Sequence, residues 1–162
     1  MAVVLWKIDE RLVHGQVVSS FGKFLGADEF IVVNDIVAYD DDQISLMEMA
    51  VPVGADLGVV TCEGFAQVFA ENSFYGSKTV VVFRYLDDVM KCVELGVKIS
   101  VLNCAGLFQR KDRPDAIRYN QNLYCTEEDK KKFRILEDSG VKLTYQLTYA
   151  MQETPLSSQL KY

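Results

Sequence analysis

Residues 3–18, "VVLWKIDERLVHGQVV", join a short apolar run to an amphipathic segment through a charged loop. The run "VVLWKI" (3–8) is compact and rich in β-branched residues, which predicts a buried strand. From residue 15 to residue 26, apolar side chains recur at helical spacing and predict a helix. The connecting loop, "DERLVHG" (9–15), holds His14, the only histidine of the chain. This strand–loop–helix unit sets the pattern that the following residues repeat.

The same alternation continues to residue 103. Further strands are predicted at 29–34, 57–61, 79–84 and 98–103, and further helices at 40–50, 63–72 and 86–96. Five strands alternating with four helices predict an α/β fold. Because crossovers between parallel strands are right-handed, we expect a three-layer open twisted sheet, mostly parallel, with helices on both faces.

The alternation changes after residue 103. A long polar stretch leads to "LYC" (123–125), which predicts a short strand. A helix follows at 126–140, with a capping threonine and early acids, and the final strand is predicted at 141–148. Because no helix separates residue 103 from "LYC", we expect one late edge strand to run antiparallel. No shift in composition marks a boundary, so residues 1–162 are expected to form a single domain.

Composition and charge exclude several classes of function. The formal net charge of −6 argues against a nucleic-acid partner or an anionic membrane surface. No apolar run approaches the length of a membrane span, and the first residues lack the features of a signal peptide. The four cysteines form no CxxC pair, so we expect reduced, mostly buried thiols in a cytoplasmic protein and no metal site.

Polar residues gather where the predicted strands end. In open parallel sheets, ligands bind beyond the carboxyl ends of the strands, at the point where the strand order reverses. We expect the first strand to be central, with strands two and four beside it, so that His14 lies at this point. The polar residues that follow strands one, two, four and five are Asp9, Arg11 and His14; Asn34 and Asp35; Arg84; and Asn103.

The loop after the first strand has the residue types of a phosphoryl-accepting site. His14 directly precedes a helix, whose first N–H groups can hold an anion. Gly15 lets a bound group approach the backbone closely, and Arg11 offers a planar fork suited to phosphate oxygens. Asp9 could accept a hydrogen bond from one ring nitrogen of His14 and leave the other as the nucleophile.

The other candidates carry weaker indications. Arg84 is either a second phosphate ligand or a charge at a strand end, and Gln16 follows the loop on the helix. Asn34 and Asp35 are more typical of a turn and a helix entry than of phosphate ligands. No G-x-G-x-x-G follows a strand and no P-loop is present, which disfavours a dinucleotide or ATP, so no cofactor is expected.

The segment "KIDERLVHGQV" (7–17) resembles the R-[IV]-D-[DE]-R-[LI]-[IV]-H-G-Q-V motif of the mannose/sorbose-class IIB components of the bacterial phosphoenolpyruvate-dependent sugar phosphotransferase system. The resemblance extends through "FIVVNDIVAYDD" (30–41), "TVVVFR" (79–84), "VLNCAG" (101–106) and "GVKLTYQ" (140–146). It covers nearly the whole chain.

The resemblance implies a phosphohistidine carrier. A IIA protein would phosphorylate Nδ1 of His14, and the phosphoryl group would pass to a sugar delivered by membrane IIC and IID partners. Arg11 and Asp9 would support the histidine, the protein would associate peripherally with the permease, and a homodimer is left open. Positioning and electrostatics carry such a transfer, and it needs neither a metal nor a nucleotide because the donor phosphohistidine supplies the energy.

Two positions depart from the family pattern. Lys7 stands where the family usually has arginine, and "NCAG" (103–106) replaces the more usual N-x-G-G, which predicts a stiffer loop after strand five.

Two alternatives remain from the residues alone. One is a carrier that uses Cys104, at the end of strand five, as its nucleophile. The other is a non-enzymatic, receiver-like regulatory module with Asp35 as the phosphoryl acceptor. Receivers place their acceptor aspartate after strand three, whereas strand three of this chain ends in Thr61–Cys62.

Overall fold

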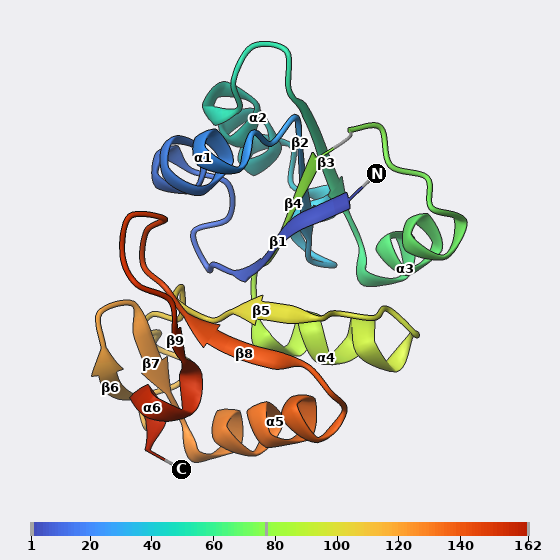
Figure 1. The fold of residues 1–162 in the computed structure, drawn as a ribbon. Helices are drawn as coiled ribbons and strands as arrows, with labels where there is room; N and C mark the ends of the chain where they lie inside the picture. Colours follow the sequence, from blue (N-terminus) through green and yellow to red (C-terminus); the bar gives the residue numbers. More distant parts are fainter. Residues whose placement is uncertain (1, 77, 162) are drawn as a thin grey trace.

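The computed structural model describes residues 2–76 and 78–161. In these residues a main sheet has the strand order β3-β2-β4-β1-β5-β8-β9, with helices on both faces (Figure 1). Its strands are β1 (Ala2–Ile8), β2 (Glu29–Val33), β3 (Asp56–Val60), β4 (Lys78–Phe83), β5 (Val101–Asn103), β8 (Lys142–Tyr145) and β9 (Thr154–Pro155). The predicted α/β architecture is confirmed.

The helical segments follow the strands in the expected alternation as far as β5. They are the π-helix η1 (Val17–Gly22), α1 (Lys23–Leu25), the 3-10 turn η2 (Val37–Tyr39), α2 (Asp41–Ala50), α3 (Cys62–Glu71), α4 (Leu86–Glu94), α5 (Glu127–Asp138) and α6 (Leu156–Leu160). The helix predicted at 15–26 is therefore present, but its middle turns have the wider π geometry, which is rare and is often found near functional sites.

Two core layers follow from the period-2 alternation of the strands. On β2, Phe30 belongs to the layer beneath α1 and α2, which also contains Met47. The next residue, Ile31, belongs to the opposite layer, which contains Phe65 of α3. Helices therefore cover both faces of the sheet, which gives the three layers that the sequence predicts.

β1 is the central strand, and the order of the sheet reverses there. Its neighbours are β4 and β5, so the expectation that strand two lies beside it is wrong. β4 pairs in parallel with both β1 and β2 and separates them. Five of the six β4 residues are buried, and an apolar strand of this kind is stable where both of its faces are covered.

The two halves of the sheet meet at a narrow joint between β1 and β5. Their pairing register consists of one residue pair, Lys7 with Asn103. Beyond the strands, the Glu10 N–H donates to the Gly106 carbonyl at 2.9 Å. The chain leaves β1 toward β2 and leaves β5 toward β8, in opposite directions, which opens a crevice at this joint.

The region after residue 103 differs from the expectation in detail. "LYC" forms β7 (Leu123–Cys125), which pairs with β6 (Ile117–Asn120) in a separate antiparallel hairpin. The last predicted strand ends at Tyr145, and β9 and α6 follow it. The late antiparallel edge strand of the main sheet is β9, which pairs with β8. β9 has two residues, too few for a periodic sequence pattern.

The closest backbone approach at the β1–β5 joint occurs at Gly106. A Cβ atom built on Gly106 would lie 2.6 Å from the Cα of Asp9 and would also collide with the Ile8 carbonyl. We therefore expect Gly106→Ala to reduce the free energy of unfolding by about 1–3 kcal/mol, measured by urea denaturation. Gly58→Ala is the matched control, because a Cβ there would meet Ile31 at an ordinary 3.7 Å. Equal unfolding midpoints for the two variants would contradict this account of the joint.

Candidate functional site

The loop between β1 and the first helix has a fixed, strained shape. The Leu12 N–H donates to the Asp9 carbonyl at 2.9 Å, which closes a tight turn. Leu12 has φ = +66°, a left-handed conformation that is unfavourable for a leucine. Its side chain is buried in the core, and this packing opposes the strain. The loop therefore presents its polar side chains in one arrangement.

Asp9 is the centre of that arrangement. Its side chain is fully buried. Oδ1 accepts hydrogen bonds from the Arg11 backbone N–H at 3.0 Å and from Arg11 Nε at 3.1 Å. Oδ2 accepts from Arg11 Nη2 at 3.1 Å and lies 3.1 Å from Nε2 of His14. The structure thus brings together the three residues that the sequence grouped.

The bond to Asp9 distinguishes the two nitrogens of the His14 ring. A carboxylate can only accept, so Nε2 carries the proton and Nδ1 keeps its lone pair. Among the described residues, none forms a hydrogen bond with Nδ1, and the side chain is 20% exposed. The geometry therefore leaves Nδ1 as the ring nitrogen that is free to bind a ligand.

His14 also marks the start of the helix. The Val18 N–H donates to the His14 carbonyl at 3.1 Å, which is the first bond of the helical turn. The preceding N–H groups, those of Gly15, Gln16 and Val17, lie in the first turn, where a helix lacks carbonyl partners. A Cβ atom on Gly15 would meet nothing within 4 Å, so the space beside this turn is open. The turn can accept an anion next to the ring.

A second buried charge lies behind Asp9. Lys7 Nζ is 3.7 Å from Asp9 Oδ2 and donates to the Ala105 carbonyl at 2.5 Å. Burial alone would raise the pKa of Asp9, but the hydrogen bond to His14, the charge of Lys7 and the hydrogen bond to Arg11 lower it to about 2. Asp9 is therefore ionised throughout the neutral range.

The loop opens into a pocket of about 330 Å³. One wall is the loop itself, residues 11–15, and the other is α2. The α2 residues that line it are Gln43, Leu46, Met47 and Ala50. The pocket thus has the polar side chains of Arg11 and His14 on one wall and a mostly apolar wall opposite.

Three residues that the sequence did not single out, Glu10, Phe108 and Arg110, support the loop from the β5 side. Glu10 accepts hydrogen bonds from Arg110 Nη1 at 2.7 Å and from the Phe108 N–H at 3.2 Å. The Arg11 guanidinium lies 4.9 Å from the centre of the Phe108 ring. The acid at position 10 and the basic run "QRKDR" (109–113) after the fifth strand were the available signals. Their pairing spans 100 positions of sequence, which no local pattern reveals.

The weaker candidates have separate positions. Gln16 joins the site, since its Oε1 accepts from Arg11 Nη2 at 3.1 Å. Arg84 follows Phe83, whose carbonyl accepts the Asp9 N–H at 2.9 Å, so its backbone begins beside the loop. Its guanidinium lies 5.0 Å from the Tyr85 ring, and its buried Nε has no hydrogen-bond partner in the described part of the chain.

Asn34 and Asp35 hold neighbouring loops in place. Asn34 Nδ2 donates to the Asp88 carboxylate, and its Oδ1 accepts two backbone N–H groups of its own turn. Asp35 accepts from the Cys62 N–H and from Lys91 Nζ, each at 2.8 Å. None of these bonds, within residues 2–76 and 78–161, reaches the His14 loop, so phosphate contact by either residue stays a prediction.

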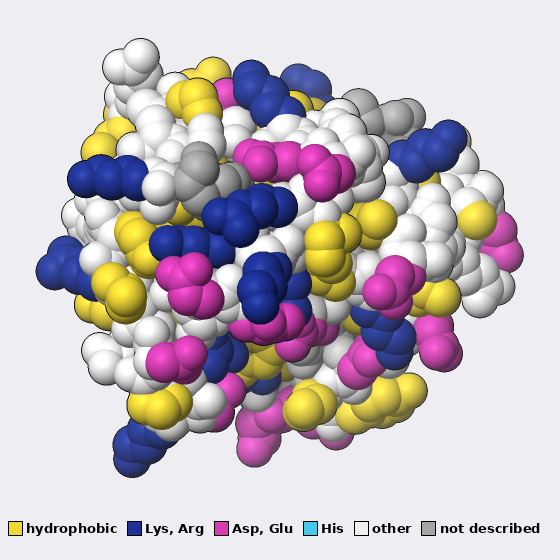
Figure 2. Space-filling view, turned by 90° about the horizontal axis from the view of Figure 1, so that it is seen from below, with side chains coloured by type: hydrophobic (Ala, Val, Ile, Leu, Met, Phe, Trp, Pro, Cys, Tyr) yellow, Lys and Arg dark blue, Asp and Glu magenta, His cyan; other side chains and the backbone are white. Residues whose placement is uncertain are grey.

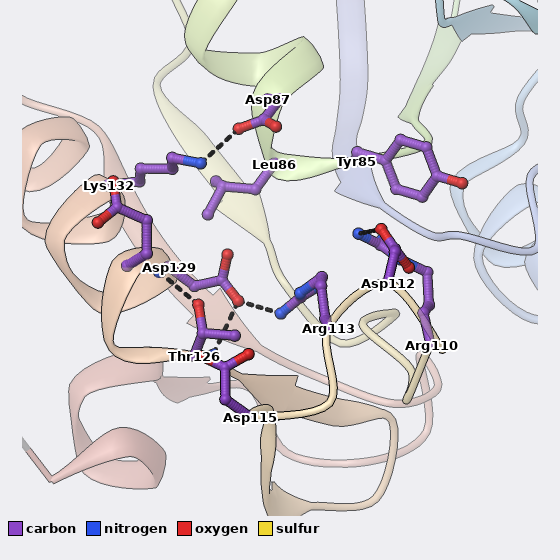
Figure 3. Close-up of a pocket in the computed structure, with 11 residues that line it drawn as sticks. Tyr85, Leu86, Asp87, Arg110, Asp112, Arg113, Asp115, Thr126, Asp129 and Lys132 are labelled. Atoms are coloured by element: carbon purple, nitrogen blue, oxygen red, sulfur yellow. Dashed lines mark hydrogen bonds and ion pairs between the residues drawn. The ribbon is translucent and has the colours of Figure 1, made fainter.

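A second pocket, of about 300 Å³, lies between α4, α5 and the segment around residue 112 (Figure 3). Two ion pairs cross the pocket: Arg113 with Asp129, and Lys132 with Asp87 at 2.6 Å. Figure 2 shows basic and acidic side chains interleaved over the face seen there, without a block of one sign. Carboxylates outnumber basic side chains in the lining of the pocket, so it is less suited to an anion than the His14 loop is.

The cysteines are free and buried, as the sequence predicts. Burial raises the pKa of the Cys104 thiol well above its usual value, which keeps it protonated. Within the described residues, no group of three or more His, Cys, Asp or Glu side chains could hold a metal ion. None of the described helices is long and apolar enough to cross a membrane.

The fold is an open α/β sheet whose polar crevice lies at the end of its central strand, and this class is shared with known proteins. Residues 3–162 match the model of the PTS system sorbose subfamily IIB component, and the chain belongs to this family. Its members are the IIB phosphotransferase components of sugar uptake in the mannose/sorbose class.

Several relatives and solved structures resemble the chain over most of its length. It is 31% identical over 144 residues to the fructose-specific EIIB component of Bacillus subtilis, which covers 88% of this chain and 86% of that protein. It is 32% identical over 143 residues to the sorbose-specific EIIB component of Klebsiella pneumoniae, with 88% and 85% covered. The crystal structure of the IIBSor domain of the sorbose permease from Klebsiella pneumoniae has a TM-score of 0.89 at 28% identity, over 99% of this chain and 97% of that one.

The ionised Asp9 carboxylate makes folding sensitive to acid. Its pKa of about 2 in the folded state lies below the value of 3.8 expected when exposed, so its contribution is present above about pH 4 and is lost as the pH falls toward 2. The shift corresponds to about 2 kcal/mol. We expect the gap in unfolding free energy between the wild type and Asp9→Asn to shrink by about two thirds of this amount between pH 6 and pH 2.5, measured by urea denaturation, because pH 2.5 is still above the folded-state pKa. The exposed Asp41→Asn variant should keep the wild-type pH dependence, and a gap that is constant with pH would contradict the assignment.

Proposed function

We propose that the chain is a phosphohistidine carrier in which Nδ1 of His14 accepts a phosphoryl group from a IIA protein and passes it to a sugar. The observation that carries this proposal is the bond between His14 Nε2 and the buried Asp9. It leaves Nδ1 available, and His14 lines an open pocket at the start of a helix. Membership of the sorbose-type IIB family supports the same role.

Phosphoryl transfer places charge on three equatorial oxygens, and the loop has donors for them. Arg11 supplies a permanent positive charge, and its Nη2 is held by Asp9 and by Gln16. The N–H groups that begin at Gly15 supply the positive end of the helix. Arg84 is a weaker candidate, because its guanidinium has an unsatisfied Nε but no bond to the loop.

The reaction runs through two exchanges at one atom. In the first, the donor P–N bond breaks as the bond from Nδ1 to phosphorus forms. In the second, that bond breaks as a sugar oxygen binds phosphorus and the hydroxyl proton is released. Asp9 holds Nε2 through both exchanges, so the ring need not turn. Because each exchange moves an existing phosphoryl group from one atom to another, the proposed reaction needs no cofactor.

The partners are proposed from the family. The mannose-specific EIIAB component of Escherichia coli K12 is 31% identical over 143 residues, which are 88% of this chain and 43% of that protein. Its name joins IIA and IIB in one component, which supports a IIA donor for this chain. The acceptor would be a sugar at a IIC/IID permease, with this protein acting from the cytoplasmic side. Relatives named for fructose, sorbose and mannose leave the sugar itself open.

The first test is the identity of the acceptor. With the general phosphotransferase proteins, a IIA donor and phosphoenolpyruvate, we expect one phosphoryl group on His14, acid-labile and alkali-stable, detected by intact mass and site mapping. His14→Ala should lose it. Cys104→Ser should keep it, because the buried thiol lies outside the pocket lining. Loss of labelling in the cysteine variant instead would reject His14 as the acceptor.

The second test separates transfer from folding at Arg11. Arg11→Lys keeps the charge but removes the fork, so both exchanges should slow by about 10²- to 10³-fold, judged by the loss of one donor from an oxyanion site. The thermal unfolding temperature should fall by only a few degrees: lysine keeps a positive charge beside the buried Asp9, although the two hydrogen bonds of the guanidinium fork to that carboxylate are lost. Rapid-quench measurements with labelled donor give the rates, with the exposed Arg118→Lys as the control. A wild-type rate in Arg11→Lys would make Arg11 a loop charge without a part in transfer.

A further inference from the structure

Lys7 is a charged residue in a position that the fold reserves for the core. It lies on the central strand β1 between the buried residues Trp6 and Ile8, and is itself 1% exposed. An ammonium group removed from water is destabilising unless other groups compensate it. The three groups that do so come from three segments: Asp9 from the loop, the Ala105 carbonyl from the β5 side, and the Phe21 ring of η1, whose centre is 5.7 Å from Nζ.

Lys7 approaches the same carboxylate oxygen that holds the histidine. Asp9 Oδ2 lies 3.1 Å from His14 Nε2, 3.1 Å from Arg11 Nη2 and 3.7 Å from Lys7 Nζ. His14 and Arg11 reach it from the partly exposed side, and Lys7 reaches it from the interior. A change at Lys7 therefore acts on the bond between Asp9 and His14 without any contact with the pocket.

The backbone of Lys7 has a second function in the same place. It forms the one register pair between β1 and β5, and its side chain extends this link to Ala105. Ala105 precedes Gly106, whose carbonyl accepts the Glu10 N–H at 2.9 Å. The ammonium group thus connects the His14 loop to the other half of the sheet at its narrowest joint.

We propose that Lys7 is a positioning residue for phosphoryl transfer: its buried ammonium group balances the Asp9 carboxylate behind His14 and fixes that carboxylate against the β5 loop. The inference rests on the proposed function of His14 and adds to it a residue that is not among the proposed phosphate ligands. Lys7 contacts neither the His14 ring nor the pocket beside it, so its effect on His14 passes through Asp9.

The proposal has a consequence for pH. Burial lowers the pKa of Lys7 to about 8, against the opposing effect of Asp9, while the charge of Arg11 lowers it further. The remaining titratable neighbour, Cys104, is a neutral thiol because burial raises its pKa. As the pH rises through about 8, Lys7 loses its charge, and the site loses a positive charge that offsets Asp9 and the incoming phosphoryl group. Transfer should therefore weaken above this pH, and arginine in the same position would prevent the loss because it stays protonated.

The experiment compares the wild type with Lys7→Arg and Lys7→Met, using potassium phosphoramidate as a small phosphoryl donor. The donor P–N bond breaks, ammonia leaves, and the bond from His14 Nδ1 to phosphorus forms. Because the chain has one histidine, intact mass follows its phosphorylation rate directly from pH 6.5 to 9.5. Division by the Lys7→Arg rate at each pH removes the pH dependence of the donor itself.

We expect the wild type and Lys7→Arg to react at equal rates at pH 7. At pH 9.5 the wild type should react about tenfold more slowly than Lys7→Arg, which corresponds to about 1.4 kcal/mol in the activation free energy. Lys7→Met should react more slowly than Lys7→Arg by a similar factor at every pH. A constant ratio between the wild type and Lys7→Arg would overturn the proposal. So would a folded Lys7→Met that reacts like the wild type at pH 7, where the wild-type ammonium group is charged.

Circular-dichroism melting at pH 7 establishes whether Lys7→Met folds, and if it does not, the comparison with Lys7→Arg still decides the question. The small donor also separates this inference from the proposed function. Failure of the phosphotransferase proteins to label His14 would reject the function alone, whereas a flat ratio with phosphoramidate would reject the role of Lys7 alone.

Discussion

A single buried negative charge, that of Asp9, constrains the centre of this protein. A carboxylate without exposure to water needs compensating donors, and it has them on both oxygens. Lys7 approaches from the strand, while Arg11 and His14 approach from the loop. The shape of the turn and the orientation of the His14 ring therefore both follow from the need to place donors around the buried Asp9 carboxylate. The helix begins directly after these donors. The left-handed Leu12 is maintained because relaxing it would separate these groups.

The proposed chemistry is confined to a few residues, and the rest of the fold holds them in position. The Klebsiella pneumoniae IIBSor domain shares the fold with a TM-score of 0.89 although only 28% of its residues are identical. The same fold is thus kept although most residues differ. The approach of Gly106 to Asp9 is less tolerant, since any side chain there would collide with the backbone. Fold and site accordingly depend on different kinds of residue.

Local sequence patterns predicted the features of this structure that depend on residues close together in the chain. The strands and helices up to residue 103 follow from periodicity, and the grouping of Asp9, Arg11 and His14 follows from their spacing on one loop. Long-range pairing could not be predicted in this way. The insertion of β4 between β1 and β2 depends on competition among several apolar strands. Likewise, the bond between Glu10 and Arg110 joins loops that only the folded sheet brings together.

Alternation along β1 places Lys7 and its neighbour Trp6 on opposite faces of the sheet. Trp6 is the only tryptophan of the chain, is 7% exposed, and stacks on Phe83 with ring centres 6.2 Å apart. The tryptophan fluorescence of this protein therefore comes from its central strand, one residue away from the buried ammonium group. A buried indole in an apolar surrounding emits at shorter wavelength than one in water, so the emission of Trp6 reports the integrity of the strand under the His14 loop.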